Sequence, residues 1–217
     1  MISTQPIKRV GWLILAGMAG LAILATGFST YTAKNDGLKM MPRDQEIEMA
    51  LSAAPPNLRK DATVYVLEKN GYVKVREGTN GFSCLVVRFG DIIAPYCYDA
   101  EGAQTTMLAD FRRVELMLAG KSLKEAQAII ADEYKAGKLI APRKHGVAYM
   151  LSPEFKRHDP KTGEAKQFYP PHIMFYAPYK TNADFGIADS LVGSHKYPCI
   201  LNEGKPDAYI IVTPPIQ

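Results

Sequence analysis

A β-hairpin is predicted where apolar and polar residues alternate with a period of two on both sides of Asn70-Gly71. Asn-Gly between two such runs is the strongest short signal for a tight turn. A two-residue turn at this place pairs Val66 with Val75. It also puts Val64 and Val73 on the same side, so we expect a face of four valines against the core.

A second hairpin is predicted over residues 82–98, with Gly90-Asp91 as its turn, because glycine stands first as a type II′ turn requires. Counting outward from the turn puts Cys84 opposite Cys97, in a non-hydrogen-bonded pair whose Cα atoms lie about 4.5 Å apart. An oxidising compartment permits a disulfide at that spacing, so we predict a Cys84–Cys97 bond and a free thiol at Cys199. The alternative is three buried free cysteines, which a different register would produce.

The middle of the chain has the period of two amphipathic helices. Apolar residues between 107 and 118 fall on one helix face. Ser122 and Glu125 form a capping box, so a second helix is expected to begin at once and to lie beside the first. A shorter helix is predicted earlier in the chain, from Asp44 as its N-cap to the Pro55-Pro56 pair.

The last third of the chain returns to strands, predicted at residues 147–151, 172–177 and 208–213. Between the first two, residues 156–167 are charged and contain turn residues, so an exposed loop is expected. Strands, then two helices, then strands indicate an α+β fold. We therefore predict an antiparallel sheet built from hairpins, with two adjacent helices on one face.

An N-terminal hydrophobic segment precedes this fold, and residues 1–33 are interpreted as a signal peptide or a membrane anchor. Lys8-Arg9 comes before an uncharged run over residues 10–28, which is longer than the usual signal-peptide core and long enough to span a bilayer. Cleavage and anchoring in the inner membrane both remain open. In either case we expect an exported protein, periplasmic or secreted, with a linker at 34–43 and a single domain at 44–217.

The charge of the exported part is close to balanced. The chain has 26 basic and 22 acidic residues, and setting aside Lys8 and Arg9 leaves 24 basic residues against the same 22 acidic ones. A nucleic-acid-binding protein usually carries a basic stripe, whereas this chain has only short pairs such as Arg112-Arg113. We interpret such pairs as solvated surface charges. No nucleic-acid partner is expected, and contact with a membrane is expected only through the N-terminal segment.

Specific catalytic and cofactor motifs are absent from the sequence. There is no glycine-rich phosphate loop, no Cys-x-x-Cys and no nucleophile elbow. The four histidines are too far apart in sequence for one helix to present a metal-binding pair. We therefore predict neither a cofactor nor a metal site.

Histidine, carboxylate, hydroxyl and amide groups gather between residues 172 and 195, in a part of the chain expected to be rich in loops. Groups of these kinds can form a ligand-binding site or an acid–base pair. The candidate ligand-binding residues are His172, Tyr176, Asn182, Asp184 and His195. The alternative is that exposed turns are simply rich in these residue types, with His172 a structural histidine.

Three stretches of the sequence together resemble a group of uncharacterised exported bacterial proteins. They are REGTNGFSCL at 76–85, PHIMFYAPY at 171–179, and NEG at 202–204 followed by AYIIV at 208–212. The resemblance covers most of the chain after residue 46. It implies export and a shared domain, and it implies no activity.

A well-patterned domain without a catalytic signature is typical of a non-catalytic function. We expect an envelope or secreted domain that binds a small molecule or an envelope protein. The alternative is a hydrolase that uses His172 or His195 with Asp184 or Asp189. A purely structural envelope protein is a third possibility. A polar pocket with a histidine hydrogen-bonded to a carboxylate would favour the enzyme.

Overall fold

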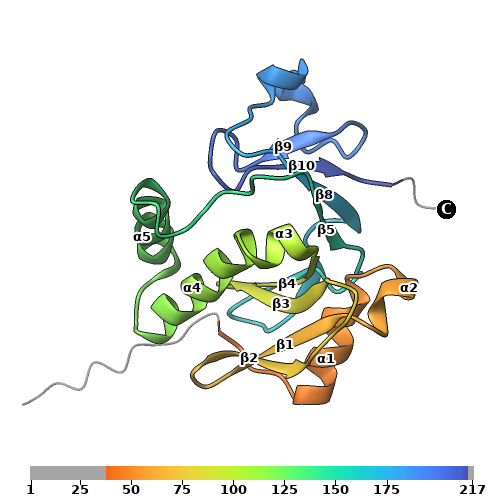
Figure 1. Cartoon of the computed structure of the whole chain (residues 1–217), viewed down its shortest axis with the longest axis vertical. Coiled ribbons are helices and arrows are strands. Elements are labelled where there is room, and N and C mark those ends of the chain that lie inside the picture. Colours follow the sequence, from red (N-terminus) through yellow and green to blue (C-terminus); the bar gives the residue numbers. More distant parts are fainter. Residues whose placement is uncertain (1–37, 215–217) are drawn as a thin grey trace, which may run out of the picture. The chain divides into compact units, whose positions relative to one another are not determined.

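The computed structural model describes residues 38–214, which form an α+β domain with a mixed, mostly antiparallel sheet (Figure 1). The predicted export segment at residues 1–33 lies outside the described residues. None of the helices in the described part has the length and apolar character needed to cross a bilayer. The helices are α1 (Arg43–Ser52), α2 (Pro56–Arg59), α3 (Ala100–Ala103), α4 (Thr106–Leu118) and α5 (Leu123–Lys135), with short 3-10 turns at Ala183–Phe185 and Asp189–Leu191.

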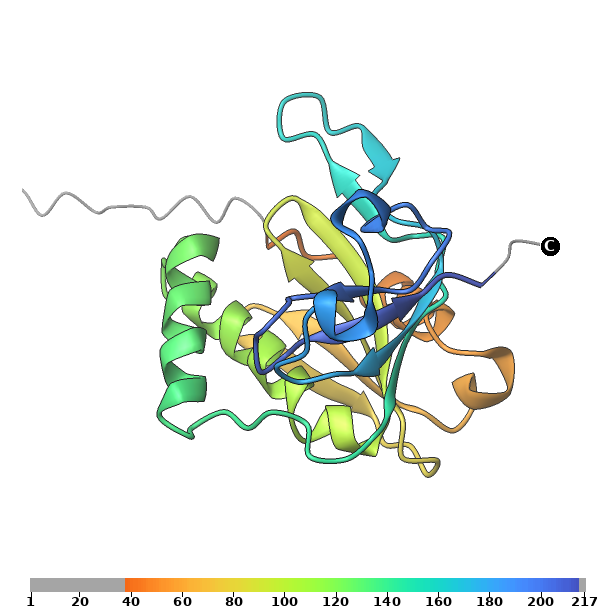
Figure 2. The ribbon, with the colours of Figure 1, turned by 90° about the horizontal axis from the view of Figure 1, so that it is seen from above.

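Eight strands follow one another in the sheet in the order β2-β1-β3-β4-β5-β8-β10-β9, and β6 and β7 form a small hairpin that extends from β4. Figure 2 shows this small hairpin projecting from the rest of the domain. The strands are β1 (Thr63–Glu68), β2 (Gly71–Arg76), β3 (Ser83–Phe89), β4 (Ile92–Tyr98), β5 (Val147–Met150), β6 (Lys156–His158), β7 (Ala165–Gln167), β8 (His172–Tyr176), β9 (Cys199–Leu201) and β10 (Tyr209–Val212).

The prediction of a purely antiparallel sheet is wrong at one place, because β1 and β3 are parallel. After the β1–β2 hairpin the chain crosses back, so that β3 lies on the other side of β1 and runs in the same direction. The crossover passes very close to the start of β1. A Cβ atom on Gly78 would lie 2.2 Å from the backbone nitrogen of Thr63, so only glycine fits there.

The register of the β1–β2 hairpin differs from the predicted one. Gly71 pairs with Glu68 as the first residue of β2, so Val66 pairs with Val73 rather than with Val75. The predicted turn requires positive φ at both of its central residues, and only Gly71, with φ of 121°, adopts it. The four-valine face is therefore not formed, since the side chain of Val73 is 41% exposed.

The β3–β4 hairpin has the predicted register throughout. Phe89 pairs with Ile92 across the Gly90-Asp91 turn, and Cys84 pairs with Cys97. The two sulfur atoms lie 2.12 Å apart, at disulfide distance, and the Cα atoms are 4.0 Å apart. Cys199 is buried and free, as predicted. The position of the turn thus predicted which two of the three cysteines pair, which the number of cysteines alone could not do.

Both faces of this hairpin are covered by helices. On one face, Ala50 of α1 and the two alanines that follow the helix, Ala53 and Ala54, pack against β1, β3 and β4. On the other face lies α4, and α5 packs beside α4 rather than on the sheet (Figure 1). The predicted pair of helices is confirmed, including the capping box in which Ser122 and Glu125 bond to each other's backbone N–H groups. The sequence predicted helices on one face of the sheet only. Helix α1 covers the opposite face, which was not predicted.

Helix α1 is joined to the sheet by a buried ion pair. An Nη1 atom of Arg88 in β3 lies 2.9 Å from Oε1 of Glu46 in α1, and both side chains are inaccessible to solvent. The same Glu46 oxygen accepts a hydrogen bond of 3.0 Å from the backbone N–H of Leu67 in β1. Asp44 is not the N-cap, because the helix already begins at Arg43, after Pro42.

Two further differences concern the last third of the chain. The charged segment at 156–167 is not an irregular loop, because residues 156–158 pair with 165–167 as β6 and β7. The short strand β9 was not predicted from the sequence. It pairs with β10 on the side opposite β8 and ends the sheet.

Peptide mapping without reduction, on protein recovered from an oxidising compartment, is expected to find Cys84 linked to Cys97 and Cys199 as a free thiol. The bond closes a loop with a sequence separation of 13. Replacing both linked cysteines by alanine should therefore lower the free energy of unfolding by about 3 kcal/mol in urea titrations. Cys199→Ala is the control that keeps the linkage. A Cys97–Cys199 bond would contradict the prediction.

Candidate functional site

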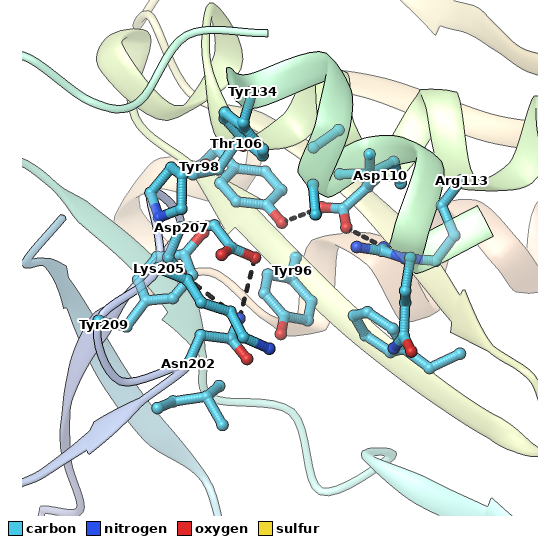
Figure 3. A pocket seen from close by; sticks show the side chains of 18 of the residues that line it. Tyr96, Tyr98, Thr106, Asp110, Arg113, Tyr134, Asn202, Lys205, Asp207 and Tyr209 are labelled. Atoms are coloured by element: carbon cyan, nitrogen blue, oxygen red, sulfur yellow. Dashed lines mark hydrogen bonds and ion pairs between the residues drawn. The ribbon is translucent and has the colours of Figure 1, made fainter. Parts of the chain in front are cut away.

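A cavity of about 660 Å³ lies between α4, α5, the β3–β4 hairpin and the connection from β9 to β10 (Figure 3). Most of its wall is apolar or aromatic. Its aromatic residues are Phe89, Tyr96, Tyr98, Tyr134, Phe155, Phe168, Tyr179 and Tyr209. Because α5 packs on α4 and not on the sheet, its inner face is free to line the cavity.

The strand β4 supplies the aromatic floor. Tyr96 and Tyr98 alternate with residues of the α1 face, so both rings point to the cavity side of the hairpin, where they stack with centroids 5.3 Å apart. Both side chains are buried, and burial raises the pKa of each phenol above its usual range. The two hydroxyls are therefore neutral hydrogen-bonding groups at physiological pH.

Helix α4 contributes a buried ion pair to the wall. The carboxylate of Asp110 accepts a hydrogen bond from the Tyr98 hydroxyl and another from Nη1 of Arg113, one turn later on the helix. The guanidinium of Arg113 also lies 4.6 Å from the ring centroid of Phe89, in the geometry of a cation–π contact. The negative charge of Asp110 is thus already balanced within the wall. Arg113 is buried, which corrects the interpretation of Arg112-Arg113 as a pair of solvated surface charges.

The turn between β9 and β10 brings a second carboxylate to the cavity. Asn202 has φ of 57° and Gly204 has φ of 71°, which reverses the chain and places Asp207 at the cavity. The amide of Asn202 donates a hydrogen bond of 2.9 Å to the Asp207 carboxylate. Burial raises the pKa of Asp207, and the nearby charge of Arg113 lowers it while that of Asp110 raises it. Figure 3 shows Asp110 and Asp207 on different elements around the same cavity.

Three buried polar atoms of residues that line the cavity lack hydrogen-bond partners among the described residues. They are the hydroxyl of Tyr134, Oγ1 of Thr106 and Nε of Arg113. Burial, and next the charge of Asp207, raise the pKa of Tyr134. Buried polar groups are nearly always hydrogen-bonded in folded proteins. These atoms are exceptions to that rule, as are Oε2 of Glu46 and Nε of Arg88 in the buried ion pair on the other face of the hairpin.

The candidate residues predicted between 172 and 195 do not line this cavity. His172 is 1% exposed, and its Nδ1 lies 2.8 Å from the carbonyl oxygen of Pro170, so Nδ1 carries the proton. His172 and His195 both pack against the ring of Tyr169, with centroid distances of 4.8 and 4.3 Å. Among residues 38–214, no hydrogen bond joins either histidine to Asp184 or Asp189.

The other three candidates hold backbone segments together. The hydroxyl of Tyr176 lies 2.9 Å from a carboxylate oxygen of Asp99. The side chain of Asn182 is buried and accepts a hydrogen bond of 2.8 Å from the backbone N–H of Ile200. The exposed carboxylate of Asp184 accepts hydrogen bonds from the backbone and hydroxyl of Thr181, which lower its pKa. Each of these three side chains thus has a hydrogen-bond partner within the domain.

The described residues contain no group of three or more histidine, cysteine, aspartate or glutamate side chains arranged to hold a metal ion. No protein-family model matches the chain, and no curated protein or solved structure is significantly similar to it. The cavity itself is therefore the feature from which a function can be argued.

The burial of His172 predicts a pH-dependent stability. Burial, with a smaller contribution from His195, lowers the pKa of His172 from 6.5 to about 4. Between these values the unfolded chain binds a proton that the folded chain does not, so the free energy of unfolding should fall by about 3 kcal/mol as the pH drops from 7 to 4. Urea titrations across this range measure the fall.

His172→Asn keeps a donor for the Pro170 carbonyl and removes the titrating group, so this part of the pH dependence should disappear. The exposed His145 provides the matched control, His145→Asn, which should behave like the unmodified protein. A His172→Asn variant that lost as much stability on acidification as the control would show that His172 is not the titrating group.

Proposed function

We propose that the domain binds a small molecule without converting it, and that the site is the cavity between α4, α5 and the sheet. The observation that supports this most strongly is the combination of a ligand-sized cavity with polar groups that converge on it from three elements. Asp110 and Arg113 come from α4, Tyr134 from α5, and Asp207 from the β9–β10 turn. Small-molecule sites typically combine an apolar wall with a few such groups.

The size of the cavity also supports a small-molecule ligand. Ligand pockets usually enclose about 300–1,000 Å³, and this cavity of about 660 Å³ falls in the middle of that range. Its aromatic rings provide large apolar surfaces, while the tyrosine hydroxyls can fix the orientation of a bound group. A protein partner would instead need a broad, exposed surface.

We do not propose the hydrolase alternative. A general base must be oriented by a partner and lie within hydrogen-bond reach of the reacting group. The ring of His172 is buried, with its Nδ1 bonded to a backbone carbonyl and not to a carboxylate. His195 packs on Tyr169 instead of on Asp184 or Asp189.

We further propose that binding takes place outside the cytoplasm. The cysteines at 84 and 97 lie at disulfide distance, which suits an oxidising compartment. The uncharged run at residues 10–28, preceded by Lys8-Arg9, is the sequence feature that would carry the chain across a membrane. A binding domain that meets its ligand in the periplasm or in the medium is consistent with both observations.

A substitution at the mouth of the cavity should block binding. Ala131 is exposed on α5 and lines the cavity, whereas Ala128 is exposed on the same helix and does not. In a ligand-observed NMR screen of fragment-sized compounds, Ala131→Trp should weaken the binding of hits by at least about tenfold. Ala128→Trp should bind them as the unmodified protein does. Equal binding by the two variants would place the ligand site elsewhere.

Export can be tested with a reporter that is active only in the cytoplasm, fused after Gln217. The fusion to the full chain should be inactive, because the segment before residue 34 carries the domain across the membrane. Deleting residues 1–33 should leave the fusion in the cytoplasm and restore reporter activity. Strong activity from the full-length fusion would contradict the proposed export.

A further inference from the structure

Asp207 is the one cavity-lining carboxylate without a cationic partner within the described residues. Its carboxylate accepts a hydrogen bond of 2.9 Å from the neutral amide of Asn202 and another from its own backbone N–H. No lysine, arginine or histidine of residues 38–214 lies within ion-pair distance of it. A carboxylate that is largely removed from water and not paired is unfavourable, so a cation placed beside it is strongly favoured.

No cationic side chain of the cavity wall forms an ion pair with Asp207. The guanidinium of Arg113 is bonded to Asp110. Lys135 lines the cavity, but it is exposed and pairs with Asp132. Lys205 also lines the cavity and its charge lowers the pKa of Asp207, but it is exposed to solvent, where water screens the charge. Asp207 is therefore the carboxylate of the wall that has no ion-pair partner among the described residues.

The aromatic wall favours the same kind of ligand. The faces of phenol and phenyl rings carry a negative electrostatic potential that attracts ammonium groups. Tyr96 and Tyr98 stack on the floor, and Tyr209 enters the wall from β10, two residues after Asp207. An ammonium group beside Asp207 would thus lie among tyrosine rings, and the apolar body attached to it would contact the rest of the wall.

We propose that the cavity selects organic cations, with the ammonium group at Asp207 and an apolar or aromatic body against the tyrosine rings. This inference rests on the proposed function, because it names the class of ligand that the cavity takes. The one buried guanidinium of the wall is bonded to Asp110, so it is not free to bind an organic anion.

Three compounds with one phenyl body separate charge from shape. Benzylamine is cationic at neutral pH, benzyl alcohol is neutral and benzoate is anionic. Their binding to the exported protein can be measured by isothermal titration calorimetry. Benzylamine is expected to bind at least about tenfold more tightly than benzyl alcohol, and benzoate most weakly.

The variant Asp207→Asn removes the charge and keeps an oxygen that can accept the Asn202 hydrogen bond. It should lose the preference for benzylamine and bind benzyl alcohol unchanged, which shows that the cavity is still formed. The matched control is Asp61→Asn, because Asp61 is exposed, lies outside the cavity and makes no side-chain hydrogen bond among the described residues. The control should keep the full preference for benzylamine.

The possible failures of the experiment are distinguishable. Equal binding of benzylamine and benzyl alcohol, or tightest binding of benzoate, would overturn the inference and leave small-molecule binding intact. A preference for benzylamine that survived Asp207→Asn would also overturn it, because the charge that selects the cation would lie elsewhere. If none of the three compounds bound up to its solubility limit, the proposed function and the inference would both fall.

Discussion

The β3–β4 hairpin is buried on both faces, and the arrangement of the other elements follows from this constraint. Residues 83–88 and 93–98 are all buried. A strand pair in this position needs a covering layer on each side. On one side α1 and the residues after it provide this layer with Ala50, Ala53 and Ala54, whose small side chains allow the segment to lie close to the strands. Arg88 interrupts this apolar face, and its charge requires a partner in the covering helix.

Glu46 is that partner, and it fixes α1 in position. The carboxylate bonds at once to Arg88 in β3 and to the backbone of Leu67 in β1, so helix and sheet can meet in one register only. Removing one member of a buried ion pair leaves an uncompensated charge, at a typical cost of about 3–5 kcal/mol. Two apolar side chains in place of Glu46 and Arg88 could also pack well, but they would not determine so closely how α1 lies on the sheet. The ion pair thus gives specificity to one side of the hairpin.

The other side of the same hairpin meets the constraint with large aromatic side chains. Tyr96 and Tyr98 present hydroxyls that need hydrogen-bond partners when buried, and α4 supplies Asp110 for one of them. Rigid rings and a buried carboxylate cannot fill the space as closely as Ala50, Ala53 and Ala54 do on the other side. The cavity lies on the aromatic side, and Asp110, one of its polar groups, is the hydrogen-bond partner of Tyr98.

The sequence was most informative where one local signal determined the geometry. Glycine at the first turn position set the β3–β4 register, and with it the pairing of Cys84 with Cys97. The capping box set the start of α5. At Asn70-Gly71 the same kind of signal failed, because Gly71 alone took positive φ and the turn moved by one residue. A turn signal predicts that a hairpin forms more securely than it predicts the register.

The candidate site was harder to predict, because its groups come from segments more than ninety positions apart in the sequence. Polar residues in loops, such as those from 172 to 195, suggest a binding site. Neighbouring residues of the same loop can instead supply their hydrogen bonds, as Thr181 does for Asp184. Asp110 gave a stronger signal, since it falls on the apolar face of the helix predicted at 107–118. Burying a carboxylate is unfavourable unless it is paired, so its presence on such a face implies hydrogen-bond or ion-pair partners in the core. Those partners, Tyr98 and Arg113, belong to the cavity that the fold brings together.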